Sequence, residues 1–163
     1  MAHDSISKAD FDRYRMYWRI RNSRLEAWPV TINLQRGEIC HFSCPVKWLE
    51  QEGSKPTYEG GHRSHGFQLH YTRDFEPSRL GTYSLPNHEY KYAGHGTAYL
   101  TNRRVIFTSS TFNRQAVLSE MLAITPYLNG IDLKVTTGNS PFLNFDQNVD
   151  LFAMTLNRLM AEQ

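Results

Sequence analysis

Cysteine and histidine are the residue types in this sequence best suited to holding a metal ion. Cys40 and Cys44 lie four residues apart, and His62 and His65 follow in the next loop, so together they include ligand types that zinc prefers. The residues around the cysteines alternate as in a strand, where a four-residue separation spans roughly 13 Å. That is too far for one ion or a disulfide. We therefore expect two reduced thiols, no bound metal and no cofactor.

The histidines are also candidate general bases for hydrolytic chemistry. The chain has seven histidines, and Ser64, Ser84 and Cys44 are candidate nucleophiles. None of these residues lies in a nucleophile elbow or beside a recognisable triad signature. Seven histidines in 163 residues are enough to scatter by chance. The sequence therefore predicts no catalytic residue and no enzymatic activity.

Arginines interleaved with aromatic residues form a third group of candidate functional residues. The arginines are Arg13, Arg15, Arg19, Arg21 and Arg24, and the aromatic residues among them include Tyr14, Tyr17 and Trp18. Such a set can grip phosphates and stack on bases. The alternative is a helix packed on the rest of the domain, with its arginines solvated or paired with Asp10, Asp12 and Glu26. A net charge of only +2 argues against a bulk nucleic-acid binder.

Two further regions supply candidate binding residues. Tyr58 and Arg63 fall in the Gly- and Pro-rich segment 51–65, which we expect to be an exposed loop. Glutamates interrupt the cations of this loop, so it has no clean polybasic cluster for anionic lipid. Arg103 and Arg104 come at or just after an expected hairpin turn, where they can bond neighbouring carbonyls or form an anion site.

Helical patterns flank a long region of strand-like alternation. Residues 7–24 predict a helix with a capping-box-like Ser7 and Asp10, and Phe11, Tyr14, Trp18 and Leu25 on one apolar stripe. Residues 147–161 predict a closing helix that buries Phe152, Leu156 and Leu159. Between them, alternation predicts strands at 30–34, 39–49, 67–71, near 83 and 90, 97–101, 105–107, 117–118, 122–125 and 131–135, with a last apolar piece at 142–145.

This order predicts an α+β, mainly β fold, in which a barrel of roughly seven strands is closed by the C-terminal helix and preceded by an N-terminal helix. We expect a single globular unit, with residues 1–28 as a helical lead-in and 29–163 as the main domain. Asn129-Gly130 and Asn102-Arg103 are the expected hairpin turns. Gly94 and Gly96 are expected to permit a bend or bulge at a strand entry.

Three segments resemble the bacterial PH-like (GRAM-like) family. They are residues 32–42, 94–110 and 138–159, and the central one has the pattern Gly94-x-Gly96-x-x-x-Leu100-Thr101-x-x-Arg104. Residues 17–29 also resemble the lead-in of such proteins. The resemblance implies a PH-like fold for residues 29–163. Eukaryotic relatives of this family bind phosphoinositides, peptides or proteins, so the family implies a fold more firmly than a function.

These observations favour a non-enzymatic binding module. A protein partner or self-association is the first expectation, for a regulator, an immunity-type factor or a phage or mobile-element accessory protein. Anionic lipid head groups, or nucleic acid bound through the arginine helix, remain alternatives. The polar first ten residues resemble no signal peptide, and no apolar run approaches the roughly 20 residues of a membrane span. We therefore expect a cytoplasmic location.

Overall fold

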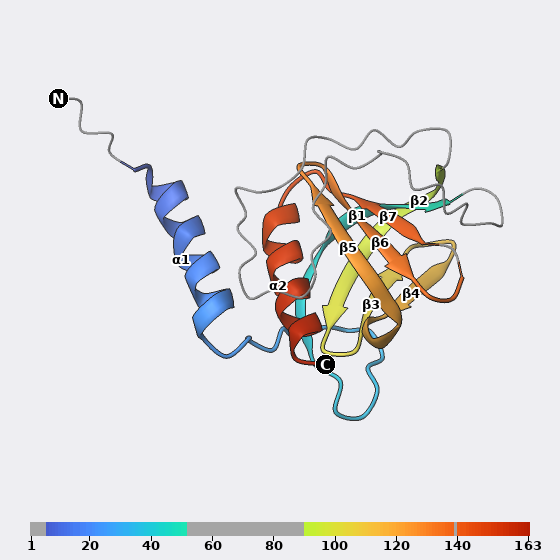
Figure 1. Cartoon of the computed structure of the whole chain (residues 1–163), viewed down its shortest axis with the longest axis horizontal. Coiled ribbons are helices and arrows are strands. Elements are labelled where there is room, and N and C mark those ends of the chain that lie inside the picture. The colour runs from blue at the N-terminus through green and yellow to red at the C-terminus, as the bar shows by residue number, and fades with distance from the viewer. Residues whose placement is uncertain (1–5, 52–89, 139) are drawn as a thin grey trace.

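The computed structural model describes residues 6–51, 90–138 and 140–163 as two helices and one antiparallel sheet of seven strands (Figure 1). This confirms the α+β, mainly β fold class. The elements are α1 (Lys8–Asn22), β1 (Cys40–Gln51), β2 (Tyr90–Thr101), β3 (Arg104–Thr108), β4 (Asn113–Val117), the 3-10 turn η2 (Leu118–Glu120), β5 (Met121–Tyr127), β6 (Gly130–Val135), β7 (Pro141–Asn144) and α2 (Val149–Ala161).

The sheet has the strand order β4-β3-β2-β1-β7-β6-β5, with β4 and β5 at its edges. The expected closed barrel is therefore wrong for the described part of the chain. Between β4 and β5 the chain passes through η2, and an opening of about 440 Å³ separates Gln115–Val117 from Val135 and Pro141. Because a 3-10 turn replaces a tight hairpin turn, the two edge strands are consecutive in sequence but do not pair.

Strand β1 is the centre of the sheet and runs through a proline. Its burial alternates as predicted, with Cys40, Phe42, Cys44, Val46 and Trp48 in the core. Pro45 is exposed in the middle of the strand and pairs in register with Thr97. The final residues of β1, Lys47–Glu50, also pair with β7, so this one strand joins both halves of the sheet.

The hairpin formed by β2 and β3 confirms the strands predicted at 97–101 and 105–107. Leu100 and Phe107 are fully buried, and the turn falls at Asn102-Arg103. Trp48 pairs with Gly94 but Leu49 pairs with Tyr92, so β2 carries one extra residue at the predicted bulge. At Gly96 an added Cβ would lie 2.1 Å from the Thr108 carbonyl oxygen, so only glycine allows the two strands to approach this closely.

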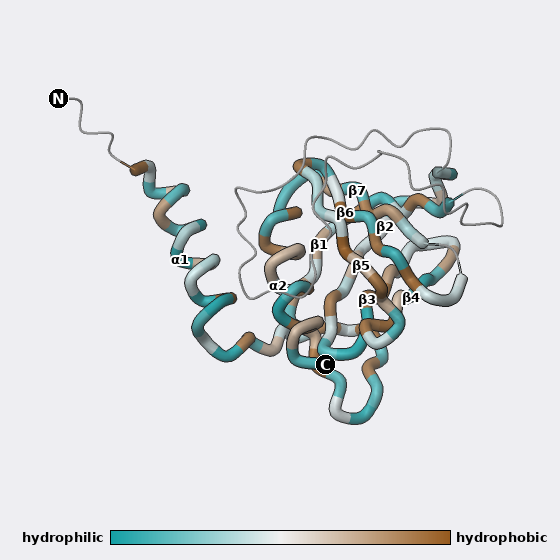
Figure 2. Tube along the Cα trace, in the orientation of Figure 1, coloured by the Kyte–Doolittle hydropathy of each residue, from teal (hydrophilic) through white to brown (hydrophobic). Residues whose placement is uncertain are grey.

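Helix α2 packs its apolar side chains into the core, as predicted. Phe152 and Leu156 are fully buried, and Leu159 is almost so. The ring of Phe152 makes edge contacts with Phe42 of β1 and with Phe145. In Figure 2 the apolar residues gather on α2 and the strands, whereas α1 is polar along most of its length.

Two expectations for the N-terminal half need correction. Helix α1 ends at Asn22 and not at residue 24, although Ser7 caps it as predicted, accepting a bond from the Asp10 N–H at 3.1 Å. Residues 30–34 form no strand. Their alternation is real, because Val30, Ile32 and Leu34 are half-buried, but they pair with no strand of the described sheet.

The strands expected at 67–71 and near 83, and the loop expected beyond Gln51, lie outside the described residues. Among the residues described, neither helix is long and apolar enough to cross a bilayer.

Replacing Phe152 with alanine tests how much the closing helix contributes to stability. We expect Phe152→Ala to lower the free energy of unfolding by about 3–5 kcal/mol, because it leaves a cavity among well-packed aromatic rings. Equilibrium denaturation measures this. Leu122→Ala, which trims a side chain 51% exposed on β5, should change it by no more than about 0.5 kcal/mol. A loss below about 1 kcal/mol for Phe152→Ala would contradict this packing.

Candidate functional site

One carboxylate at the start of α2 holds the N-terminal helix in place. Arg13 donates from Nε and Nη2 to the two oxygens of Asp150, at 2.8 and 2.7 Å, and the Tyr17 hydroxyl donates to the same carboxylate. The Asn148 side-chain oxygen accepts two further bonds from Arg13, each at 3.3 Å. A bidentate arginine–carboxylate pair fixes orientation as well as distance, so α1 is held at a defined rotation about its axis.

Near neutral pH, Asp150 is ionised and Tyr17 is protonated at this anchor. Burial opposes ionisation of Asp150, but the hydrogen bonds from Arg13 and Tyr17 outweigh it and lower the pKa of the carboxyl group. Burial and the bond to Asp150 raise the pKa of Tyr17 to about 12. The phenol therefore stays a hydrogen-bond donor, and Asp150 stays an acceptor.

A second arginine binds the C-terminal end of α1. Arg158 of α2 donates to the Ile20 carbonyl at 2.6 Å and to the Ser23 carbonyl. The last carbonyl groups of a helix have no partner within it, so this cation satisfies them from outside. With Asp150 at one end and Arg158 at the other, α1 lies along the outer side of α2 (Figure 1).

A different side of α1, centred about 125° around the helix axis from Arg13, Tyr17 and Ile20, carries an aromatic stripe that faces solvent. Phe11, Tyr14 and Trp18 are 61%, 62% and 62% exposed. Their spacing of i, i+3 and i+7 places them within about 60° of one another around the helix axis. Of the predicted apolar stripe, Phe11, Tyr14 and Trp18 are therefore turned outward, whereas its fourth member, Leu25, packs against the core. The inward face is the one with Arg13, Tyr17 and Ile20, because α2 offers that face a carboxylate and an apolar surface.

Cations surround this stripe. At 100° per residue, the four exposed side chains Lys8, Arg15, Arg19 and Arg21 fall with the three aromatic residues inside a sector of about 160°. Asp10 and Asp12 of α1 fall just outside the two edges of that sector. We call this surface the α1 outer face and define it by Lys8, Phe11, Tyr14, Arg15, Trp18, Arg19 and Arg21. It is aromatic and cationic with no carboxylate inside it.

The structure divides the residues that the sequence singled out. Arg13 and Tyr17 are anchors and not exposed binding groups, and Arg13 pairs with Asp150 and not with the expected acids nearby in sequence. Arg15, Arg19 and Arg21 lie on the α1 outer face, while Arg24 is exposed just past the end of the helix. Tyr58 and Arg63 lie outside the described residues.

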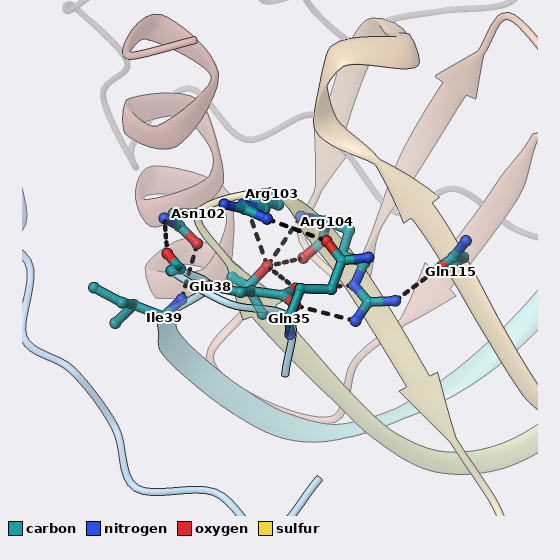
Figure 3. Close-up of polar contacts among 9 residues, drawn as sticks. Gln35, Glu38, Ile39, Asn102, Arg103, Arg104 and Gln115 are labelled. Atoms are coloured by element: carbon teal, nitrogen blue, oxygen red, sulfur yellow. Dashed lines mark hydrogen bonds and ion pairs between the residues drawn. The ribbon is translucent and has the colours of Figure 1, made fainter. Parts of the chain in front are cut away.

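Arg103 and Arg104 belong to a separate network at the β2–β3 turn (Figure 3). Arg104 donates to both oxygens of Glu38, at 2.9 and 3.0 Å, and to the Gln115 side chain at 2.7 Å. Arg103 donates to Gln35 at 3.3 Å. Since Arg104 uses Nε and both terminal nitrogens on protein partners, it serves structure here. Its partners are side-chain oxygens, whereas the sequence had suggested backbone carbonyls.

Glu38 is the structural centre of that network, and sequence reasoning missed it. Its side chain is fully buried. Burial disfavours the charged form, but hydrogen bonds from Arg104, the Gln35 N–H and the Thr101 hydroxyl outweigh it and lower the pKa of Glu38 to about 2. The one available signal was the Gly37 turn beside it, which has φ +79° and brings the acid back towards the hairpin.

The two cysteines are free and buried in the core. Burial raises the pKa of both thiols, that of Cys44 to about 12. Because the thiolate is the reactive form, neither is disposed to act as a nucleophile. In the described ranges, no three histidine, cysteine, aspartate or glutamate residues gather as metal ligands would.

No protein-family model matches the chain, and no curated protein matches its sequence. Function is therefore inferred below from the geometry of the site itself.

The Arg13 anchor can be tested by amide hydrogen exchange. We expect Arg13→Gln to raise exchange rates within α1 by about tenfold or more, because a hydrogen bond to a charged group contributes about 1.5–3 kcal/mol. Amides of the β2–β3 hairpin should keep their protection. Arg15→Gln removes the same charge from the outer side of the same helix and should leave α1 protected. Unchanged α1 protection in Arg13→Gln would contradict the anchor.

The Glu38 network predicts a specific acid sensitivity. The folded-state pKa of Glu38 lies below its ordinary value of 4.5, so its stabilisation is present above about pH 4.5 and is lost as the pH falls towards 2. We expect wild type to exceed Glu38→Gln in free energy of unfolding by about 3 kcal/mol at pH 7, with the gap closing by pH 2. Denaturation at several pH values measures it. Glu26→Gln, at an exposed site, should follow wild type, and a gap independent of pH would contradict the network.

Proposed function

We propose that this protein is a non-enzymatic binding module that docks the α1 outer face into an apolar, acid-rimmed groove on a protein partner. The observation that carries the proposal is the trio Phe11, Tyr14 and Trp18, each more than 60% exposed on a helix that is anchored through other residues. Large aromatic side chains that are exposed to solvent on an ordered helix would contribute favourable free energy if a partner buried them.

The spacing of the three rings supports a helix-in-groove mode of recognition. Residues at i, i+3 and i+7 are the anchors that an amphipathic helix lays into a hydrophobic groove. Tryptophan, tyrosine and arginine are also the residue types that dominate binding energy at protein interfaces. Because Asp150 and Arg158 already order α1, docking would not have to overcome the entropy of forming the helix.

The charges on the α1 outer face favour an acidic partner. The cations Lys8, Arg15 and Arg19 of this face would meet complementary carboxylates at the groove rim, which steers association and excludes basic partners. Self-association through this face is disfavoured, because two copies would bring like charges together. The aromatic stripe spans only about 60° and arginines border it closely, so it offers a bilayer a narrow apolar edge. A protein groove therefore suits it better than a lipid surface or a nucleic acid.

The fold belongs to the same proposal. We infer that residues 29–163 form a PH-like domain with residues 1–28 as its lead-in. The strand order, with β1 joining β2 and β7, and the C-terminal helix packed on the core support this. So does the resemblance around Gly94, Leu100 and Arg104. In this role the main domain is a scaffold that presents α1.

The test compares capture and direct binding across matched variants. Wild-type protein is used to capture partners from host lysate, and each captured protein is then purified and titrated. We expect a partner with an acidic groove whose affinity falls at least a hundredfold with Phe11→Ala/Tyr14→Ala/Trp18→Ala, since each anchor contributes about 1–2 kcal/mol. Lys8→Glu/Arg15→Glu should slow its association.

The control is Leu122→Ala/Leu128→Ala, which removes side chains 51% and 49% exposed on and just after β5 and should bind as wild type does. Equal affinity of the aromatic triple variant and wild type for every purified partner would overturn the proposal. So would binding to phosphatidylglycerol vesicles, or to a single-stranded oligonucleotide, that depends on the same three residues while no protein does.

A further inference from the structure

A second concave site lies at the C-terminal end of α1, on the side facing the domain. The cavity has a volume of about 290 Å³ and is bounded by α1, the segment after it, the start of β1 and Thr155 of α2. Its apolar wall consists of Met16, Ile20, Leu25, Trp28 and Phe42. This volume is at the lower end of the roughly 300–1,000 Å³ typical of ligand pockets, so it suits a small molecule.

The walls of this cavity are held in place by bonds from four elements. The Trp28 N–H donates to the Cys40 carbonyl at 2.8 Å, and its ring lies 4.9 Å from that of Phe42, centroid to centroid. His41 Nδ1 donates to the Glu26 carbonyl at 2.7 Å. Arg158 holds the last carbonyls of α1. Helix α1 is bonded to α2, and the segment after α1 is bonded to β1. The cavity is therefore formed before any ligand binds.

The polar rim of the cavity has an excess of positive charge. Arg19 and Arg24 both line it, and neither makes an ion pair within the described part of the chain. Glu26 supplies one carboxylate to the same rim. The balance of two guanidinium groups against one carboxylate favours a ligand with a single negative charge over a polyanion.

Hydrogen-bonding groups at the cavity complete the ligand description. Since His41 uses Nδ1 on the Glu26 carbonyl, its Nε2 is the ring nitrogen left for a ligand. No described residue accepts a bond from the indole N–H of Trp28, which is 36% exposed. An aromatic ring in a ligand can pack against Trp28 and Phe42 while its anionic group meets an arginine.

We propose that this cavity binds a small organic monoanion with an aromatic body, such as an arylalkanoate. The carboxylate is held by Arg24 and Arg19, and the ring lies against the wall that contains Trp28. The site shares Arg19 with the α1 outer face, but Phe11, Tyr14 and Trp18 of that face do not line the cavity. It does not depend on the proposed protein docking.

The experiment titrates the full chain with 4-phenylbutyrate and, in parallel, with its neutral isostere 4-phenylbutyramide. Binding is followed by amide chemical shifts and by calorimetry. We expect saturable binding of the carboxylate, with shift changes at residues 16–28, 41–42 and 155. The amide should bind about tenfold more weakly, because it loses a charge-assisted hydrogen bond.

Variants separate the anion site from a general apolar cavity. Arg24→Gln should weaken 4-phenylbutyrate binding about tenfold and leave the amide unaffected. Arg36→Gln, at an exposed arginine outside the cavity, should bind both as wild type does. Equal affinity for carboxylate and amide would overturn the proposal, as would no saturable binding at millimolar concentration. Shifts confined to Phe11, Tyr14 and Trp18 would also overturn it, without touching the docking proposal.

Discussion

The shared carboxylate of Asp150 determines where the N-terminal helix lies and which side of it meets solvent. A buried carboxylate is costly unless its charge is matched and its oxygens are bonded, and Arg13 and Tyr17 do both for Asp150. Those two residues are one turn apart on α1, so satisfying Asp150 sets the rotation of the whole helix. The exposure of Phe11, Tyr14 and Trp18 follows from that choice, and so does the placement of Met16 and Ile20 at the cavity beside the domain.

This arrangement inverts the usual distribution of residues on an amphipathic helix. On α1 the side facing the domain is held by an ion pair and a phenol, with Ile20 as its apolar contact, and the outer side carries the three rings. Polar anchoring is strongly directional, whereas apolar packing tolerates rotation. A helix that must present particular side chains to a partner benefits from the first kind of contact. The residue distribution is therefore consistent with a helix that is held for display and is not part of the core.

Local patterns predicted much of the fold, while long-range polar contacts were beyond them. The β2–β3 hairpin, the bulge at Gly94 and the buried face of α2 follow from alternation, turn residues and helical spacing over short windows. The anchor joins Arg13 to a residue 137 positions away, and Glu38 meets Arg104 across 66 positions. Periodicity cannot identify such partners. For that reason the aromatic stripe was assigned to the wrong side, and the alternation at 30–34 predicted a strand without a neighbour.

The two proposed sites depend on the same anchor in different ways. The α1 outer face requires that the helix is ordered. The cavity requires that α1 stays in its anchored position relative to Trp28 and His41, which line the cavity with it. A ligand in the cavity would add contacts between α1 and β1 and would favour the anchored position. Any protein that binds the anchored helix would favour the same position. Two ligands that both select one state of a shared element assist each other's binding by the same free energy. Positive coupling between the proposed arylalkanoate and the proposed acidic partner is therefore expected wherever α1 leaves its anchored position, and competition for Arg19, which both proposed sites use, would oppose it.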